Sequence, residues 1–106
     1  GVKEGEWFYK LGNYMEKGNY ASGQRYGKWK HYDDEDNLLY EGKYIDGNRQ
    51  GDHFWYRKDG TIKEKTSYMM GRKTGKSVKY NIDGTPFLII TYKNGKEIKY
   101  DGVDIY

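Results

Sequence analysis

The sequence predicts an all-β protein, folded as an elongated single-layer antiparallel sheet of tandem 24-residue β-hairpin repeats. Three observations favour this fold class. Tyrosines recur every 24 residues, and glycines follow them at fixed offsets. The 13 Tyr, 3 Trp and 3 Phe residues supply large side chains that pack well on half-buried strand faces. No segment keeps the apolar spacing of three and four residues that an amphipathic helix needs.

The composition describes a small domain with a thin core, which we place at residues 1–106 as one repeat domain. Charged residues make up 33% and apolar residues 35%, a balance typical of disorder unless aromatic side chains compensate, as they do here. The absence of cysteine excludes disulfides, thiolate nucleophiles and zinc–thiolate sites, and it fits a cytoplasmic and an exported protein equally. No apolar run is long enough to cross a bilayer, so we expect a soluble protein.

Five columns of residues, each with the same spacing, define the repeat. They are the tyrosines Tyr20, Tyr44, Tyr68 and Tyr92; the glycines Gly23, Gly47, Gly71 and Gly95; the glycines Gly27, Gly51 and Gly75, with Lys99 in the last copy; the aromatic residues Phe8, Tyr32, Tyr56 and Tyr80; and the turn residues Gly12, Asp36, Gly60 and Gly84. The columns indicate about four copies. The segment 95–106 begins a fifth copy and stops after half of it, so we expect it to form a closing strand.

Each period is expected to contain a strand, a turn, a returning strand and a second turn. In the second copy, residue types alternate over 27–32, a polar run follows at 33–37, and 38–44 forms the returning strand. Later copies place Asp-Gly at 59–60 and 83–84, a dipeptide typical of hairpins because glycine readily adopts positive φ. Short connections make sequence neighbours antiparallel, so eight or nine strands should lie side by side in one sheet.

The tyrosine columns are expected to form ladders that stabilise a sheet without a covering layer. Cross-strand aromatic pairs contribute roughly 0.2 to 1 kcal/mol each. Gly18, Gly42 and Thr66 share strand faces with the tyrosines and are small enough to leave room for a neighbouring ring. We therefore interpret these columns first as packing.

The best-formed copy resembles a known repeat. A Gly-x-Trp-x-x-Tyr strand at 27–32, an Asp/Asn-Gly turn in other copies and a Tyr-x-x-Gly-x-x-x-Gly connection at 44–51 resemble the membrane occupation and recognition nexus (MORN) repeat, and more closely its bacterial variant. The likeness covers nearly the whole chain.

The later copies depart from that pattern, because His53 and Ser77 stand where the second copy has Trp29, Trp55 appears two residues after His53, and Lys99 interrupts a glycine column. The resemblance implies a single-layer hairpin array that acts as a scaffold. Bacterial proteins similar to this variant include antitoxin-like and immunity-like proteins, and eukaryotic relatives of the broader class tether to membranes or to partner proteins. A fold of this kind does not by itself define a function.

Residues for catalysis or metal binding are scarce, so we expect no enzyme activity, no cofactor and no metal. His31 and His53 share strand parity and could approach one another, but a third ligand such as Asp33 would be needed and the spacing matches no zinc pattern. The acidic run at 33–36 lacks the spacing of a calcium loop and is interpreted as a solvated turn.

The sequence therefore favours a module that binds another protein. Tryptophan, tyrosine and arginine dominate the energetics of protein interfaces. The expected centre of the surface consists of Trp29, His31, Tyr32, Trp55 and Tyr56. For Tyr32 and Tyr56 packing in a ladder is favoured over binding, whereas Trp29 and Trp55, on the other strand parity, suit either role. The resemblance suggests a toxin as the partner.

Three alternatives stay open. Residues 54–106 hold 11 Lys/Arg against 6 Asp/Glu, while residues 1–53 hold 8 against 10. The basic end could bind anionic lipid through Arg72, Lys73, Lys76 and Lys79. Single-stranded nucleic acid could stack on the aromatic side chains, although a net charge of only +3 and four consecutive acidic residues disfavour it. Unpaired edge strands could also join two copies edge to edge.

Overall fold

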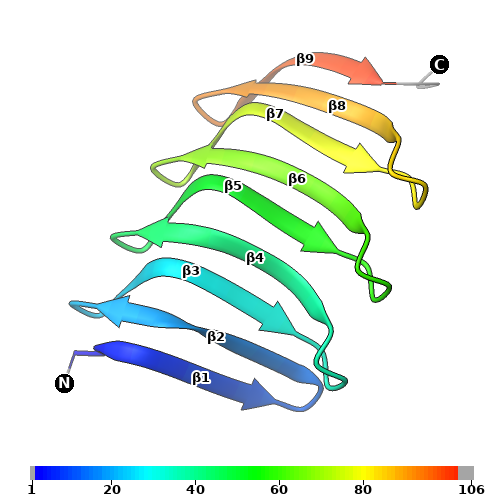
Figure 1. Ribbon diagram of the computed structural model, residues 1–106. Coiled ribbons are helices and arrows are strands. Elements are labelled where there is room, and N and C mark those ends of the chain that lie inside the picture. Colours follow the sequence, from blue (N-terminus) through cyan, green and yellow to red (C-terminus); the bar gives the residue numbers. More distant parts are fainter. Residues whose placement is uncertain (1, 103–106) are drawn as a thin grey trace.

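The computed structural model describes residues 2–102 and confirms the predicted fold class: one open antiparallel sheet whose strands lie in sequence order (Figure 1). The strands are β1 (Gly5–Leu11), β2 (Tyr14–Ala21), β3 (Gln24–Tyr32), β4 (Leu38–Ile45), β5 (Asn48–Tyr56), β6 (Ile62–Met69), β7 (Arg72–Tyr80), β8 (Pro86–Lys93) and β9 (Lys96–Gly102). The sheet measures 52 × 33 × 17 Å, so it is elongated and thin. The expected closing strand is β9, and the part of that expectation at 103–106 lies outside the described residues.

Bulges explain the second glycine column. The register of the β4–β5 pair shifts between Glu41 and Lys43, where Gly51 has a φ of 78°. Gly27 and Gly75 occupy the matching places in the β2–β3 and β6–β7 pairs, also with positive φ. Residues with a Cβ rarely adopt this conformation, so glycine is selected here, and each bulge bends its strand.

Two-residue turns line one edge of the sheet, the left edge in Figure 1. They consist of Ser22–Gly23, Asp46–Gly47, Met70–Gly71 and Asn94–Gly95, and both residues of each turn have positive φ. This is the hairpin turn that suits the twist of paired strands. Each turn glycine also donates its N–H to a carbonyl of the preceding hairpin, as Gly47 does to Arg25 at 3.0 Å and Gly71 to Arg49 at 2.9 Å. The turns therefore attach successive repeats to one another.

The other edge begins with the short β1–β2 turn at residues 12–13 and continues with three longer connections. In each, the first residue donates its backbone N–H to the carbonyl four residues later, from Asp33 to Asn37, Arg57 to Thr61 and Asn81 to Thr85, at 2.8 to 3.0 Å. The expectation of a solvated turn at 33–36 is only partly met, because the carboxylate of Asp33 is buried and accepts hydrogen bonds from the backbone N–H groups of Glu35 and Asn37.

The two faces of the sheet differ in character. One face, which we call the ladder face, carries the buried rings Trp29, Tyr40, Tyr44, His53, Tyr68 and Tyr92. The opposite face, the lysine face, carries Lys17, Lys28, Lys30, Lys43, Lys65 and Lys76. Within residues 2–102 no second layer covers either face. The core therefore consists of the ladder rings and the side chains between them.

The expected role of small residues beneath the rings is confirmed at Gly18 and Gly42. A Cβ on Gly18 would overlap the indole of Trp29, and a Cβ on Gly42 would overlap the imidazole of His53. At Thr66 the neighbour on the following strand is Ser77 in place of a ring, and the two hydroxyls are hydrogen bonded at 2.7 Å. The third copy thus replaces a glycine–ring pair by two hydroxyl side chains.

Candidate functional site

Trp29 lies wholly inside the ladder. Its side chain is 0% exposed, its indole N–H donates to the carbonyl of Asn19 at 3.0 Å, and the guanidinium of Arg25 covers its ring at 4.2 Å. Tyr20 packs edge-on against it, with ring centroids 5.1 Å apart. Trp29 therefore stabilises the sheet and offers no surface to a partner.

His53 occupies the same column one repeat later and is also 0% exposed. Its Nε2 lies 2.9 Å from the carbonyl of Lys43, which can only accept, so Nε2 carries the proton. Its Nδ1 is then free to accept the hydroxyl proton of Tyr40, and Tyr44 donates in turn to Tyr40 at 3.1 Å. Arg49 Nε completes the chain by donating to Tyr44 at 3.3 Å. This buried chain of hydrogen bonds requires a neutral imidazole.

Burial lowers the pKa of His53 below its ordinary value of 6.5, although the bond to the Lys43 carbonyl acts in the opposite direction. Between the lowered pKa and 6.5 the unfolded chain binds more protons than the folded one, so folding stability rises with pH in this window. We expect the free energy of unfolding to be level above pH 6.5 and to fall as the pH decreases from there toward the lowered pKa of His53.

Urea unfolding across this pH range tests the expectation. Burial also lowers the pKa of His31, but its side chain is only partly buried, so His31→Asn should keep most of the pH dependence and His53→Asn should lose it. Equal slopes for the two variants would contradict the assignment to His53.

A column of cations that was not predicted from the sequence covers the tyrosine ladder. Arg25, Arg49 and Lys73 are 24 residues apart, the same spacing that revealed the tyrosines. The guanidinium of Arg49 lies 5.2 Å from the centroid of the Tyr68 ring and donates to its hydroxyl at 3.0 Å. Lys73 lies 5.0 Å from the ring of Tyr92. Cations over aromatic faces are attracted by the ring quadrupole, so this column stabilises the ladder while keeping positive charge on its surface.

Trp55, like His31, is a ring of the expected site that remains partly exposed on the ladder face. It packs against Tyr40 with centroids 5.2 Å apart, and Arg49 lies 5.8 Å from its ring. These contacts hold the indole in place while part of it faces solvent. His31 lies beyond Tyr40 on the same face, with Nε2 3.5 Å from a carboxylate oxygen of Glu16.

The five expected contact residues do not form one patch. Trp29, His31 and Trp55 are on the ladder face, whereas Tyr32 and Tyr56 are half-buried on the lysine face. Tyr56 donates its hydroxyl proton to Glu41 at 2.7 Å. Burial is the larger cause and this hydrogen bond the second cause that raise the pKa of Tyr56 to about 12. His31 and His53 do not approach as a ligand pair, because the ring of Tyr40 contacts both of them and lies between them.

The four basic residues named for lipid binding are divided as well. Lys73 and Lys79 lie on the ladder face, Lys76 lies on the lysine face, and Arg72 lies beside the β6–β7 turn. A flat membrane surface could therefore contact only part of this set at one time.

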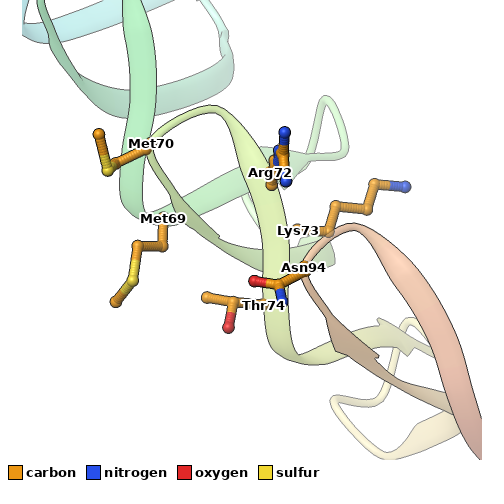
Figure 2. A pocket seen from close by; sticks show the side chains of 6 residues that line it. All are labelled: Met69, Met70, Arg72, Lys73, Thr74 and Asn94. Carbon is orange, nitrogen blue, oxygen red and sulfur yellow. The ribbon is translucent and has the colours of Figure 1, made fainter.

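Two hollows lie side by side around the β6–β7 turn. The first, the basic hollow, has a volume of about 780 Å³ and is lined by Arg49, Tyr68, Gly71, Arg72, Lys73, Tyr92, Gly95, Lys96 and Glu97. The second, the third-turn hollow, has a volume of about 370 Å³ and is lined by Met69, Met70, Arg72, Lys73, Thr74 and Asn94 (Figure 2). Arg72 and Lys73 line both, so the two hollows form one continuous surface. Figure 2 shows the methionines on one side of the turn and Lys73 and Asn94 on the other.

The described residues form neither a metal site nor a helix that could span a membrane. Among residues 2–102 no three His, Cys, Asp or Glu side chains converge as ligands of a metal ion. The same part of the chain contains no helix that could cross a membrane. Comparison with known proteins is also negative, since no protein-family model and no curated protein matches this chain.

Proposed function

We propose that this protein is a non-catalytic module that binds another protein on its ladder face, with Trp55 at the centre of the contact. The observation that supports the proposal most is the position of Trp55, which is partly exposed on an uncovered sheet face while Tyr40 and Arg49 fix its orientation. A rigid aromatic side chain loses little conformational entropy when a partner covers it. Tryptophan and arginine together are the residues most often found at binding hot spots.

The resemblance of the repeat suggests a type of partner. The hairpin pattern resembles bacterial MORN-variant proteins, among which antitoxin-like and immunity-like proteins occur, so a bacterial toxin is the first partner to test. In this proposal the array neutralises or sequesters the toxin by holding it against the ladder face. The sheet itself serves as a scaffold.

Affinity capture with matched variants tests this function. Trp55 and Phe54 are consecutive half-buried aromatic residues of β5 on opposite faces, so Trp55→Ala and Phe54→Ala remove similar side chains from the two faces. We expect a stoichiometric protein partner to be captured by the parent chain and by Phe54→Ala, with at least a tenfold loss of affinity for Trp55→Ala, the order of a hot-spot truncation of about 2 kcal/mol. Circular dichroism should first show that both variants are folded. Loss of the partner with Phe54→Ala alone would place the contact on the lysine face and contradict the proposal.

A further inference from the structure

The β6–β7 turn, the third of the four turns that contain Ser22, Asp46, Met70 and Asn94, departs from the others in a way that folding does not explain. Met70 has a φ of 49°, a left-handed conformation that Asn and Asp tolerate far better than methionine. The matching residues of the other turns are Ser22, Asp46 and Asn94. Met70 is also 77% exposed, so its side chain gains almost nothing from packing. A residue that is unfavourable for its backbone and unused by the core points to selection for contact with something else.

The methionine that precedes the turn supports this view. Met69, the last residue of β6, is exposed beside Met70, and the matching residues of the other copies are Ala21, Ile45 and Lys93, so only here do two methionines stand together. Methionine is flexible and polarisable, and it is common on surfaces that adapt to the apolar side chains of a partner. The two side chains together line the third-turn hollow (Figure 2).

The adjoining basic hollow has an excess of positive charge. None of the ion pairs within residues 2–102 involves its four cations, Arg49, Arg72, Lys73 and Lys96. One carboxylate, that of Glu97, lines the hollow and accepts a hydrogen bond from Tyr92 at 3.4 Å. Arg49 is oriented by its bonds to Tyr44 and Tyr68 and has further N–H donors to offer. The hollow therefore suits several carboxylates of a ligand.

The Trp55 contact and the two hollows are continuous. Arg49 lies 5.8 Å from the centroid of the Trp55 ring and also lines the basic hollow, and Arg72 and Lys73 line both hollows. A partner that contacts Trp55 could therefore also contact the two hollows, because all three belong to one continuous surface.

We propose that the third turn and the basic hollow dock an acidic segment of the partner protein that also presents an apolar side chain. Its carboxylates contact Arg49, Arg72, Lys73 and Lys96, and its apolar side chain packs on Met69 and Met70. This inference rests on the proposed function, because it names the part of the partner that extends beyond Trp55.

The test uses a synthetic peptide of glutamate and leucine residues as the probe, measured by isothermal titration calorimetry. Met70→Asn should raise the midpoint of thermal unfolding, because asparagine tolerates the turn conformation, and should weaken peptide binding about tenfold through the lost apolar contact. Asp46→Asn is the matched control, since Asp46 has the same φ of 49° one repeat earlier and should leave peptide binding unchanged. If Met70 had only a structural role, Met70→Asn would not raise thermal stability while it lowers peptide affinity.

Two double variants test the charge. Lys73→Gln with Lys96→Gln removes two cations of the basic hollow, and Lys43→Gln with Lys76→Gln removes two exposed lysines of the lysine face. We expect about a tenfold or greater loss of peptide affinity for the first pair only. A peptide with glutamine in place of glutamate should bind neither the parent chain nor the variants.

Several results would overturn the inference. Equal losses for the two lysine pairs would show non-specific attraction to net charge, and tighter binding of oligothymidine than of the peptide would indicate a nucleic-acid site. If the captured partner depends on Trp55 but neither it nor the peptide responds to Met70→Asn, the inference is wrong and the proposed function stands. If no protein partner is captured at all, the proposed function fails independently of the peptide result.

Discussion

Substitution of alanine for Gly42 is expected to destabilise the sheet by about 3 kcal/mol or more, a large part of the stability of a domain this size. The added Cβ would overlap ring atoms of His53, which is buried between Tyr40, Tyr44 and Tyr68 and has no space to move into. Displacement of the ring would also break its hydrogen bonds to Tyr40 and to the Lys43 carbonyl. Urea unfolding followed by circular dichroism measures the loss.

Gly60→Ala provides the control for this substitution. Gly60 has a φ of 89°, and an added Cβ there meets nothing within 4 Å, so the change costs only the backbone preference of about 1 to 2 kcal/mol. A second test copies the third repeat, in which Thr66 and Ser77 replace the glycine–ring pair. Gly42→Thr combined with His53→Ser should be more stable than Gly42→Thr alone. A Gly42→Ala variant that loses less stability than Gly60→Ala would contradict the packing we describe.

Trp29→Ala is expected to cost about 3 to 5 kcal/mol, the range for removal of a buried aromatic side chain. The indole is fully enclosed by Gly18, Tyr20 and Arg25, and its N–H bond to Asn19 would be lost as well. Chemical denaturation of Trp29→Ala and of Trp55→Ala, compared in free energy of unfolding, shows which tryptophan stabilises the sheet.

Trp55→Ala should cost only about 1 to 2 kcal/mol, because part of the ring is already exposed. Trp29→Ala should therefore cause the larger loss of stability, and Trp55→Ala should cause the larger loss of partner affinity. Equal stability losses would mean that Trp55 is a ladder residue and not a contact residue.

The regular spacing of the sequence made the fold predictable. Tyr20, Tyr44, Tyr68 and Tyr92 identified the repeat, and short connections between strands left few topologies other than a meander. The small residues Gly18 and Gly42 could be assigned to the space beneath a ring because strand parity places them on the tyrosine face.

The candidate site was less predictable. Strand parity already separates Trp29 and Trp55 from Tyr32 and Tyr56, but parity does not say which face buries its rings more deeply. That depends on the small residues opposite each ring and on bulges such as the one at Gly51, which alter the register locally. His53 could not be recognised as a buried polar core residue, because its hydrogen-bond partners come from a neighbouring strand.

Two features are visible in the sequence, but their roles could be recognised only in the structure. The spacing of Arg25, Arg49 and Lys73 repeats the tyrosine period, yet only the structure places these cations over the rings. Met70 stands in a turn column with Ser22, Asp46 and Asn94, and its positive φ and exposure show how unusual it is.

Thiol labelling tests most directly whether the ladder face is the binding face. The sequence contains no cysteine, so a single introduced thiol is unique. Lys79 and Lys76 are exposed lysines of β7 on the ladder and lysine faces, and Lys79 lies on the same row as Trp55, across Glu64. We predict that the captured partner slows maleimide labelling of Lys79→Cys and leaves Lys76→Cys unchanged. Protection of Lys76→Cys with free labelling of Lys79→Cys would contradict the account and place the partner on the lysine face.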